Sequence, residues 1–439
     1  MSQSPLLRIE NVHIYPRDES HMWGGWIDTP KQGDELDVYS LNLVGWALGR
    51  SSRTVAIEYL HAGVKLGRVP VNVERPDIPK AFPDAQEALV CGFRASVSVV
   101  PLPLESDIFI QAVLADETRV PLAVISVKRQ PIAAAFQPRL QPLLISTLGR
   151  TGSTWVARVL GEHPQITAYR PFEYEPRMLT YWLAMLKNVA DPASYSRALT
   201  GDLDNGGWWN DPGRGDSPPA AKIREPAIQQ WLGRTNVEDT ARFAMQRVDD
   251  FYSEVARSQG KSGAVFFAEK GWPEIFVPQM VSELCSGAKE IILVRDFRDV
   301  ISSILSFNRK RGYAAFGRQN ADSDRQFIRQ FRPHAVRMLD HWRERGSAAH
   351  LLRYEDVILR PEPALAAVLG YLGLDASQSV IRATLDRAAT VPREVQQGHS
   401  TSKDPAASIG RWRRDLDDPL KAECAEAIGD VLEQFGYHA

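Results

Sequence analysis

One segment indicates the architecture of the larger part of this chain: residues 144–155, which read LISTLGRTGSTW. The apolar run Leu143–Thr147 predicts a short buried strand, and the amphipathic pattern of Thr154–Gly161 predicts a helix. A turn with two glycines, Gly149 and Gly152, joins them. At such a junction the first N–H groups of the helix lack partners within the helix, and with the helix dipole they attract an anion. We therefore expect a phosphate-binding loop.

The residues of this loop are suited to phosphate. Glycine lets the backbone approach an anion closely, and Arg150 adds a permanent cation with paired donors. A Walker A loop would read G-x-x-x-x-G-K-S/T, but here Ser153 follows the second glycine and Thr147 replaces the first. The missing lysine disfavours hydrolysis of ATP or GTP, although an ordinary strand–turn–helix joint stays an alternative. The candidate binding residues are Gly149, Arg150, Thr151, Gly152, Ser153 and Thr154.

A second candidate phosphate site follows the apolar run Glu290–Val294. Arg295 stands directly after this predicted strand, and Ser303 lies eight residues further on, in a predicted helix. From these positions both side chains can face one phosphate. A charged strand end before a helix with acidic residues in its first turn is also common on protein surfaces, so these residues alone leave both interpretations open.

The wider pattern predicts an α/β fold for residues 143–439. Ala264–Ala268 and Glu290–Val294 read as buried strands, each followed by a helical pattern, and this alternation favours a parallel sheet with flanking helices. A helical insertion is expected at about residues 176–259. Its loop, Gly201–Pro219, contains the pair Trp208-Trp209, which either covers a substrate or packs the loop onto the core.

Residues 1–130 predict a different architecture, a small all-β accessory domain that resembles a sandwich. A proline-containing linker, residues 131–142, follows it. Short runs rich in β-branched residues, separated by turn signals, predict the strands Leu36–Tyr39, Leu41–Ala47, Thr54–Leu60, Val64–Val71, Phe93–Val99, Ile108–Leu114 and Val120–Val127.

Together, these motifs resemble those of sulfotransferases that use 3′-phosphoadenosine 5′-phosphosulfate (PAPS), over about residues 140–420. In that family the first loop binds the 5′-phosphosulfate, and an arginine at the place of Arg150 is typical of carbohydrate and tyrosylprotein sulfotransferases. The family's R-D-x-R-D pattern with a later serine binds the 3′-phosphate and matches Arg295 and Ser303. The resemblance implies a P-loop-like α/β fold and PAPS as the sulfuryl donor, without a metal ion.

The C-terminal residues 408–412 read SIGRW and extend the resemblance. Many bacterial members of the family end with a similar S-x-G-R-W stretch, which closes over the 3′-phosphoadenosine. This implies a role in binding PAPS for Ser408, Gly410 and Arg411, while Trp412 either stacks on adenine or packs.

The resemblance also implies the catalytic residues Glu173, Arg150 and Lys270. Carbohydrate and tyrosylprotein sulfotransferases have a glutamate after an H-P-x-I/V motif, and Glu173 would deprotonate the acceptor, with Glu175 as the second candidate. Lys270 matches the lysine of an E-K-S/T-P pattern, although Gly271 and tryptophan replace the usual residues that follow. The implied reaction is in-line sulfuryl transfer to a hydroxyl or amine, with Arg150 stabilising charge on the leaving phosphate.

Composition bounds the partners and the compartment. The chain has 439 residues, a net charge of -2 and three cysteines that are far apart. This charge does not indicate a nucleic-acid partner, and the cysteines indicate neither a disulfide framework nor a metal site. No signal peptide and no apolar stretch of about 20 residues is visible. Animal sulfotransferases that modify glycans usually carry a membrane anchor, so the resemblance to that family, without such an anchor, implies a cytoplasmic, bacterial enzyme without a membrane span.

The acceptor and the role of the β domain are less clearly indicated. Gly45-Trp46-Ala47 and Cys91-Gly92-Phe93 resemble a β module attached to bacterial glycosyltransferases of surface polysaccharides. This implies a glycan or glycolipid acceptor, or docking to a polysaccharide-assembly system; a spacer or a dimerisation domain is the alternative. Two other functions stay open: a P-loop kinase or NTPase-like phosphotransferase, and a non-catalytic carbohydrate-binding protein.

Overall fold

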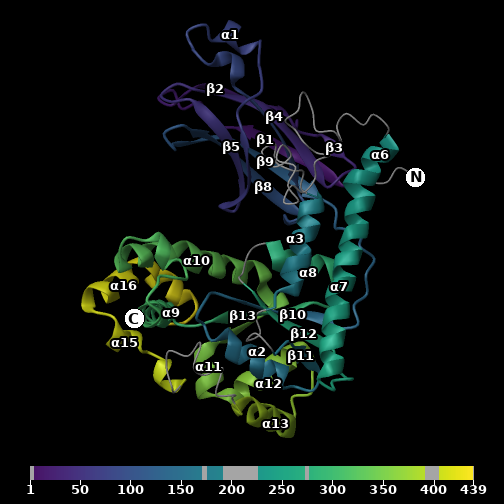
Figure 1. Ribbon diagram of the computed structural model, residues 1–439, viewed down its shortest axis with the longest axis vertical. Coiled ribbons are helices and arrows are strands. Elements are labelled where there is room, and N and C mark those ends of the chain that lie inside the picture. Colours follow the sequence, from purple (N-terminus) through teal and green to yellow (C-terminus); the bar gives the residue numbers. More distant parts are fainter. Residues whose placement is uncertain (1–3, 171–175, 191–225, 272–275, 391–404, 439) are drawn as a thin grey trace. The chain divides into compact units, whose positions relative to one another are not determined.

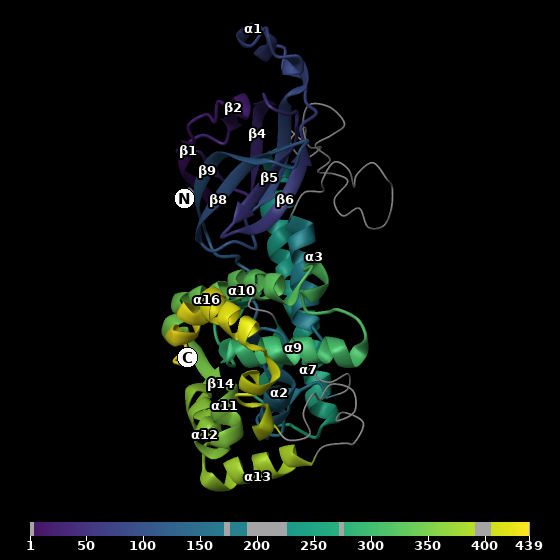
Figure 2. The same ribbon diagram turned by 90° about the vertical axis from the view of Figure 1, so that its left-hand side faces the viewer.

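The computed structural model describes residues 4–170, 176–190, 226–271, 276–390 and 405–438. The chain divides into two compact units, one of Met1–Phe136 with Tyr181–Met245 and the other of Gln137–Thr180 with Gln246–Ala439. Antiparallel sheets dominate the first unit, and a parallel sheet with helices forms the second (Figures 1 and 2).

The first unit contains two antiparallel sheets, which confirms the predicted β structure of the N-terminal part. The larger sheet has the strand order β3-β1-β9-β8-β5-β6 and the smaller one the order β2-β4-β7. Alternate side chains of the strands are buried, as in β8, where Ile108, Ile110 and Ala112 are inaccessible to solvent. The strands are β1 (Leu7–Ile14), β2 (Met22–Thr29), β3 (Glu35–Leu36), β4 (Ser40–Gly49), β5 (Thr54–His61), β6 (Val64–Pro70), β7 (Gly92–Ser98), β8 (Glu105–Leu114) and β9 (Arg119–Arg129).

The described residues 181–190 and 226–245, which are helical, also belong to the first unit. Tyr39, directly before β4, connects the strands to these helices twice. Its N–H donates to the carbonyl oxygen of Gly233 at 3.0 Å, and its hydroxyl donates to Oε1 of Glu238 at 3.1 Å. The elements concerned are most of α3 (Met178–Ala190), α6 (Pro226–Gln230), the π-helical turn η4 (Trp231–Thr235) and the first part of α7 (Asn236–Ser258).

A parallel sheet forms the centre of the second unit. Its five strands have the order β11-β12-β10-β13-β14, and all neighbours are parallel. The strand before the glycine loop, β10, therefore lies in the middle of the sheet. The predicted α/β fold with a parallel sheet is confirmed. The strands are β10 (Gln141–Thr147), β11 (Ile166–Ala168), β12 (Phe266–Gly271), β13 (Lys289–Val294) and β14 (Ala349–Arg353).

Helices cover both faces of this sheet (Figures 1 and 2). They include α2 (Ser153–Gly161), α8 (Phe276–Leu284), α9 (Phe297–Arg311), α10 (Asp324–Arg345), α11 (Tyr354–Leu359), α12 (Pro361–Leu372), α13 (Gln378–Ala389), α15 (Trp412–Asp415) and α16 (Asp418–Gln434). Ile292 and Val294 of β13 pack with α9, α10 and α16, whereas Ile291 and Leu293 pack with α2, α12 and α13. Because these strands are buried on both sides, they read as continuous apolar runs.

The carboxyl ends of the parallel strands meet at one edge of the sheet. The residues that follow β10, β13 and β14 therefore come together there: the loop 148–152, Arg295 and Tyr354. Ligands of open α/β sheets bind at this edge. The candidate site is built on it.

Candidate functional site

The loop between β10 and α2 requires both of its glycines. Gly152 precedes α2 with a left-handed φ of 89°, which favours glycine. A Cβ atom on Gly152 would lie 2.3 Å from a ring carbon of Tyr354, and a Cβ atom on Gly149 would lie 2.8 Å from the ring of Phe316. No other residue fits either place without movement of its neighbours. The two glycines therefore let Tyr354 and Phe316 pack directly against the loop backbone before the first turn of α2.

Hydroxyl groups tie this loop to the sheet. Thr147 Oγ1 donates to the carbonyl oxygen of Leu293 at 2.9 Å, and Thr151 Oγ1 donates to the carbonyl oxygen of Leu148 at 3.0 Å. The two hydroxyl oxygens are also within hydrogen-bond distance of each other; because each hydroxyl has a single proton, a bond between them would replace one of the two bonds to a carbonyl oxygen. Thr151 is completely buried, and its side chain stabilises the turn of the loop through the bond to Leu148. Ser153 and Thr154 begin α2, where their hydroxyls are partly accessible.

Arg150 points from the loop toward α9. Its Nε lies 3.4 Å from Oγ of Ser303, and its guanidinium lies 4.8 Å from the ring centre of Phe307. Burial, and then the positive charges of Arg295 and Arg411, lower the pKa of Arg150 to about 10. The guanidinium therefore remains charged at neutral pH. Because three cations lie close together in a poorly solvated place, an anion among them would be favoured.

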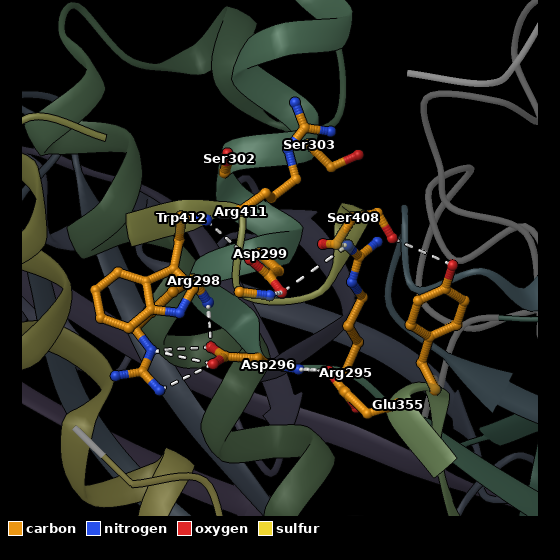
Figure 3. Close-up of polar contacts among 12 residues, drawn as sticks. Arg295, Asp296, Arg298, Asp299, Ser302, Ser303, Glu355, Ser408, Arg411 and Trp412 are labelled. Carbon is orange, nitrogen blue, oxygen red and sulfur yellow. Dashed lines mark hydrogen bonds and ion pairs between the residues drawn. The ribbon is translucent and has the colours of Figure 1, made fainter. Parts of the chain in front are cut away.

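Arg295 joins the loop to the C-terminal segment, and Figure 3 shows it beside Ser408 of that segment. Its Nη1 donates to the carbonyl oxygen of Arg150 at 3.3 Å, and its Nη2 donates to the carbonyl oxygen of Ser408 at 2.5 Å. The guanidinium also lies 4.7 Å from the ring centre of Tyr354. Within the described part of the chain, its Nε is buried without a hydrogen-bond partner. A buried, unsatisfied donor of this kind suits an anionic ligand.

Helix α9 positions Ser303 and is braced at its start. Asp296 caps the helix by accepting from the N–H of Arg298 at 3.0 Å. The side chain of Arg298 returns to Asp296 at 2.8 Å and lies 4.1 Å from the ring centre of Trp412. Asp296 and Arg298 thus stabilise the helix start, and Ser303 follows on the buried side of α9 near Arg150.

The C-terminal segment lies against α9 (Figure 3). Gly410 has a left-handed φ of 69° and donates its N–H to Asp299. The Nη2 atom of Arg411 donates to Ser306 Oγ at 3.0 Å, and its Nε donates to Asp415 at 2.7 Å. These contacts place Arg411 close enough to Arg150 for their charges to interact. The structure therefore brings Gly410, Arg411 and the other predicted nucleotide-binding residues of the described chain to one place.

Lys270 reaches the same place from β12. It is buried, and its Nζ donates to Oγ1 of Thr154 at 2.8 Å. The predicted base, Glu173, lies outside the described residues, as do Glu175 and the pair Trp208-Trp209. Of the three predicted catalytic residues, the structure therefore brings two, Arg150 and Lys270, to the loop.

Glu269, beside Lys270, is a buried carboxyl group that the sequence did not single out. It accepts from the N–H of Leu179 at 3.0 Å, from the N–H of Thr180 at 3.3 Å and from the hydroxyl of Tyr252 at 2.7 Å. It therefore caps the start of α3 from another element. Burial raises the pKa of Glu269 from its ordinary 4.5 to about 7, against the effect of these hydrogen bonds.

This raised pKa predicts a dependence of stability on pH. The folded protein holds the Glu269 proton more tightly than the unfolded chain, so its stabilising effect is full below about pH 4.5 and is lost as the pH rises through about 7. The variant Glu269→Gln cannot lose that proton. We expect the melting temperature of the wild type to fall relative to the variant between about pH 5 and about pH 8. Parallel curves would contradict this, and Glu254→Gln, at a fully exposed position, is the control.

Tyr354 belongs to the candidate site, although no ligand-binding role was predicted for it. It follows β14 at the same edge as the other ligand-binding candidates. Its ring contacts Gly152 and Arg295, and its hydroxyl lies 3.3 Å from Oγ of Ser408. One buried tyrosine thus touches all three candidate phosphate-binding elements. Its place directly after a parallel strand puts it at the ligand-binding edge, but a tyrosine there does not by itself indicate a role in the site.

Some kinds of site and segment are not found among the described residues. No group of three or more His, Cys, Asp or Glu side chains there could hold a metal ion. The helices of these ranges are all too short or too polar to cross a membrane. Cys91, Cys285 and Cys424 are buried free thiols.

Comparisons with known proteins agree with the sequence motifs. The model of the "Sulfotransferase family" matches residues 142–378. The sulfotransferase domain from the curacin biosynthetic pathway is 16% identical, with a TM-score of 0.38, and the match covers 69% of this chain and 99% of that domain. The sulfotransferase domain of the Synechococcus PCC 7002 olefin synthase is 18% identical, with a TM-score of 0.39, and the match covers 69% of this chain and 96% of that domain. A mouse sulfotransferase complexed with PAP is 12% identical, with a TM-score of 0.37, and the match covers 68% of this chain and 86% of that protein. No curated protein sequence matches the chain. These structural likenesses are too distant to bear on substrates.

Proposed function

Because this chain belongs to the sulfotransferase family, we propose that it transfers a sulfuryl group from PAPS to a hydroxyl or amine of an acceptor. We propose a glycan or glycolipid as that acceptor. The donor would bind at the edge of the parallel sheet, between the loop 148–152 and the C-terminal segment 408–412. No metal ion is part of this proposal.

One observation carries the proposal: three arginines from distant parts of the chain converge beside a glycine loop. Arg295 and Arg411 are near enough to depress the pKa of Arg150, so binding of an anionic ligand would offset their mutual repulsion. The buried Nε of Arg295 adds a donor that no described protein group satisfies. PAPS carries phosphate at both its 3′ and 5′ positions, and the two halves of this cluster suit the two groups.

The residues would divide the work between binding and chemistry. Arg295 and Ser303 would hold the 3′-phosphate, with Arg411 closing over it. Arg150 and the first N–H groups of α2 would stabilise the negative charge that develops on the 5′-phosphate as its bond to sulfur breaks. The acceptor oxygen or nitrogen forms the new bond to sulfur, and Glu173 would take its proton. Lys270, held by Thr154 at 2.8 Å, would face the sulfuryl group. PAPS supplies the sulfuryl group and leaves as adenosine 3′,5′-bisphosphate.

We also propose a setting for this reaction. The resemblance of the β domain to modules on bacterial glycosyltransferases favours a bacterial, cytoplasmic enzyme that docks to a surface-polysaccharide assembly system. A test is the sulfation of polysaccharide precursors by the full chain with radiolabelled PAPS. Transfer to phenolic acceptors alone, with none to saccharides, would argue against the proposed acceptor class.

The donor class is tested by calorimetry without metal. We expect adenosine 3′,5′-bisphosphate to bind the full chain with a micromolar dissociation constant, which corresponds to a binding free energy of about 8 kcal/mol. ATP should bind at least about tenfold more weakly. The physical reason is that Arg295, Ser303 and Arg411 require a 3′-phosphate, which ATP lacks. Binding of ATP that depends on Mg²⁺, with none of the bisphosphate, would instead support a P-loop kinase or NTPase-like phosphotransferase.

A further inference from the structure

Asp299 is a completely buried carboxylate on the first turn of α9. Both of its oxygens accept backbone N–H groups from the C-terminal segment. Gly410 donates to Oδ2 at 2.7 Å, and Trp412 donates to Oδ1 at 3.0 Å. Figure 3 shows Asp299 between the start of α9 and the segment that carries Ser408, Arg411 and Trp412. Hydrogen bonds to a charged acceptor are among the strong ones.

These bonds have a consequence for the segment itself. The N–H groups of Gly410 and Trp412 already donate to Asp299. The main group with which the segment could bind an anion is therefore the side chain of the residue between them. That side chain belongs to Arg411, whose backbone lies between the two anchored amides. Arg295, which lies between β13 and α9, holds the carbonyl oxygen of Ser408 at 2.5 Å. Arg295 and Asp299, four positions apart, thus hold one carbonyl oxygen and two N–H groups of the segment's backbone.

We propose that Asp299 is a positioning residue for the nucleotide: it fixes the segment 408–412, and with it Arg411, beside Arg150 and Arg295. In this role Asp299 would act through the backbone of the segment rather than by binding the nucleotide itself. The inference rests on the proposed function for the identity of the nucleotide, but the anchoring of the segment stands on the hydrogen bonds alone.

Asparagine is the informative replacement for Asp299. It has nearly the same shape but only one acceptor oxygen, and its amide would turn donor hydrogens toward one of the two N–H groups. One buried hydrogen bond is therefore lost and a donor is left without a partner. Position 290 offers a matched control. Glu290 lies at the other end of β13, is just as buried, and contacts His341 at 2.7 Å and Arg345 at 2.8 Å.

The experiment compares the wild type, Asp299→Asn and Glu290→Gln in two measurements. Calorimetry with adenosine 3′,5′-bisphosphate should show affinity at least about tenfold lower for Asp299→Asn and unchanged for Glu290→Gln, even if both melt at lower temperature. Amide hydrogen exchange, without nucleotide, should be faster in the peptide that spans residues 405–416 for Asp299→Asn only. A general loss of stability would affect both variants alike.

The outcomes separate this inference from the proposed function. Wild-type affinity in Asp299→Asn, or the same loss in Glu290→Gln, would overturn the positioning role. If the wild type binds no bisphosphate but the exchange result holds, the proposed function fails while the anchoring of the segment stands. Should Asp299→Asn not fold, the wild type alone still decides: the amides of Gly410 and Trp412 should exchange slowly in the free protein, and rapid exchange would overturn the inference.

Discussion

Replacing Arg150 by alanine is expected to lower the rate of sulfuryl transfer by about a hundredfold to a thousandfold, as does loss of a single donor that stabilises charge in a transition state. Arg150 is the cation of the loop itself, and its charge would oppose the negative charge that builds on the 5′-phosphate. Affinity for adenosine 3′,5′-bisphosphate should fall far less, because Arg295, Ser303 and Arg411 remain. The rate is measured as turnover of radiolabelled PAPS at saturating concentration; hydrolysis of PAPS, in which water takes the sulfuryl group, is the assay that needs no acceptor substrate. The affinity is measured by calorimetry.

Two further variants make this prediction specific. Arg150→Lys keeps the charge and should recover part of the rate. Arg332→Ala removes an exposed arginine that pairs with Asp430 at 2.7 Å, and should leave both readings unchanged. Unchanged turnover in Arg150→Ala would mean that the loop arginine takes no part in the chemistry, and a non-catalytic binding protein would then be the better interpretation.

The second large effect is expected for Arg295→Ala, in binding rather than in turnover. The variant should bind adenosine 3′,5′-bisphosphate at least about a hundredfold more weakly, since two hydrogen bonds between charged partners are each worth about 1.5–3 kcal/mol. Part of the loss would pass through Ser408, whose carbonyl oxygen Arg295 holds at 2.5 Å. At saturating PAPS the turnover should stay within a few-fold of the wild type, because Arg150 and Lys270 remain.

Arg295→Lys distinguishes the two contributions to this loss. Lysine keeps the charge but cannot reach both carbonyl oxygens, so an intermediate affinity is expected. If Arg150→Ala and Arg295→Ala lowered turnover equally at saturating donor, the proposed division between chemistry and binding would be wrong.

For the fold, local pattern was informative wherever an element is regular. The strands β10 and β13 were predicted nearly at their observed ends because they are buried on both faces and read as unbroken apolar runs. The strands β1 and β2 were missed, and each is irregular. The pairing of β1 shifts register between Ile9 and Asn11, and that of β2 shifts near Gly24. Bulges of this kind interrupt the alternation on which strand prediction relies, although β5 and β8, which also shift register, were predicted.

For the site, the residues that the sequence singled out are those whose predicted role follows from their place after a strand. Arg150 and Arg295 are such residues, and the structure brings them together. Tyr354 holds an equivalent place after β14, but a tyrosine at a strand end carries no chemical signature, so only its contacts with Gly152 and Arg295 identify it. Glu269 was likewise invisible, since its burial and its raised pKa depend on Tyr252 and the start of α3.

The sequence by itself determined the parallel sheet, the glycine loop and the arginine after β13, because periodicity, glycine and charge at a strand end are properties of neighbours in the chain. Only the tertiary structure decided what surrounds them. Asp299 and Gly410 are 111 positions apart, and Arg295 and Ser408 are 113 apart. Tyr39 and Glu238, which join the strands of the first unit to its helices, are 199 apart. The sequence does not indicate which carboxylate will accept a hydrogen bond from which backbone amide, because the chain contains many groups of both kinds. The packing of the helices over the sheet selects which of them do.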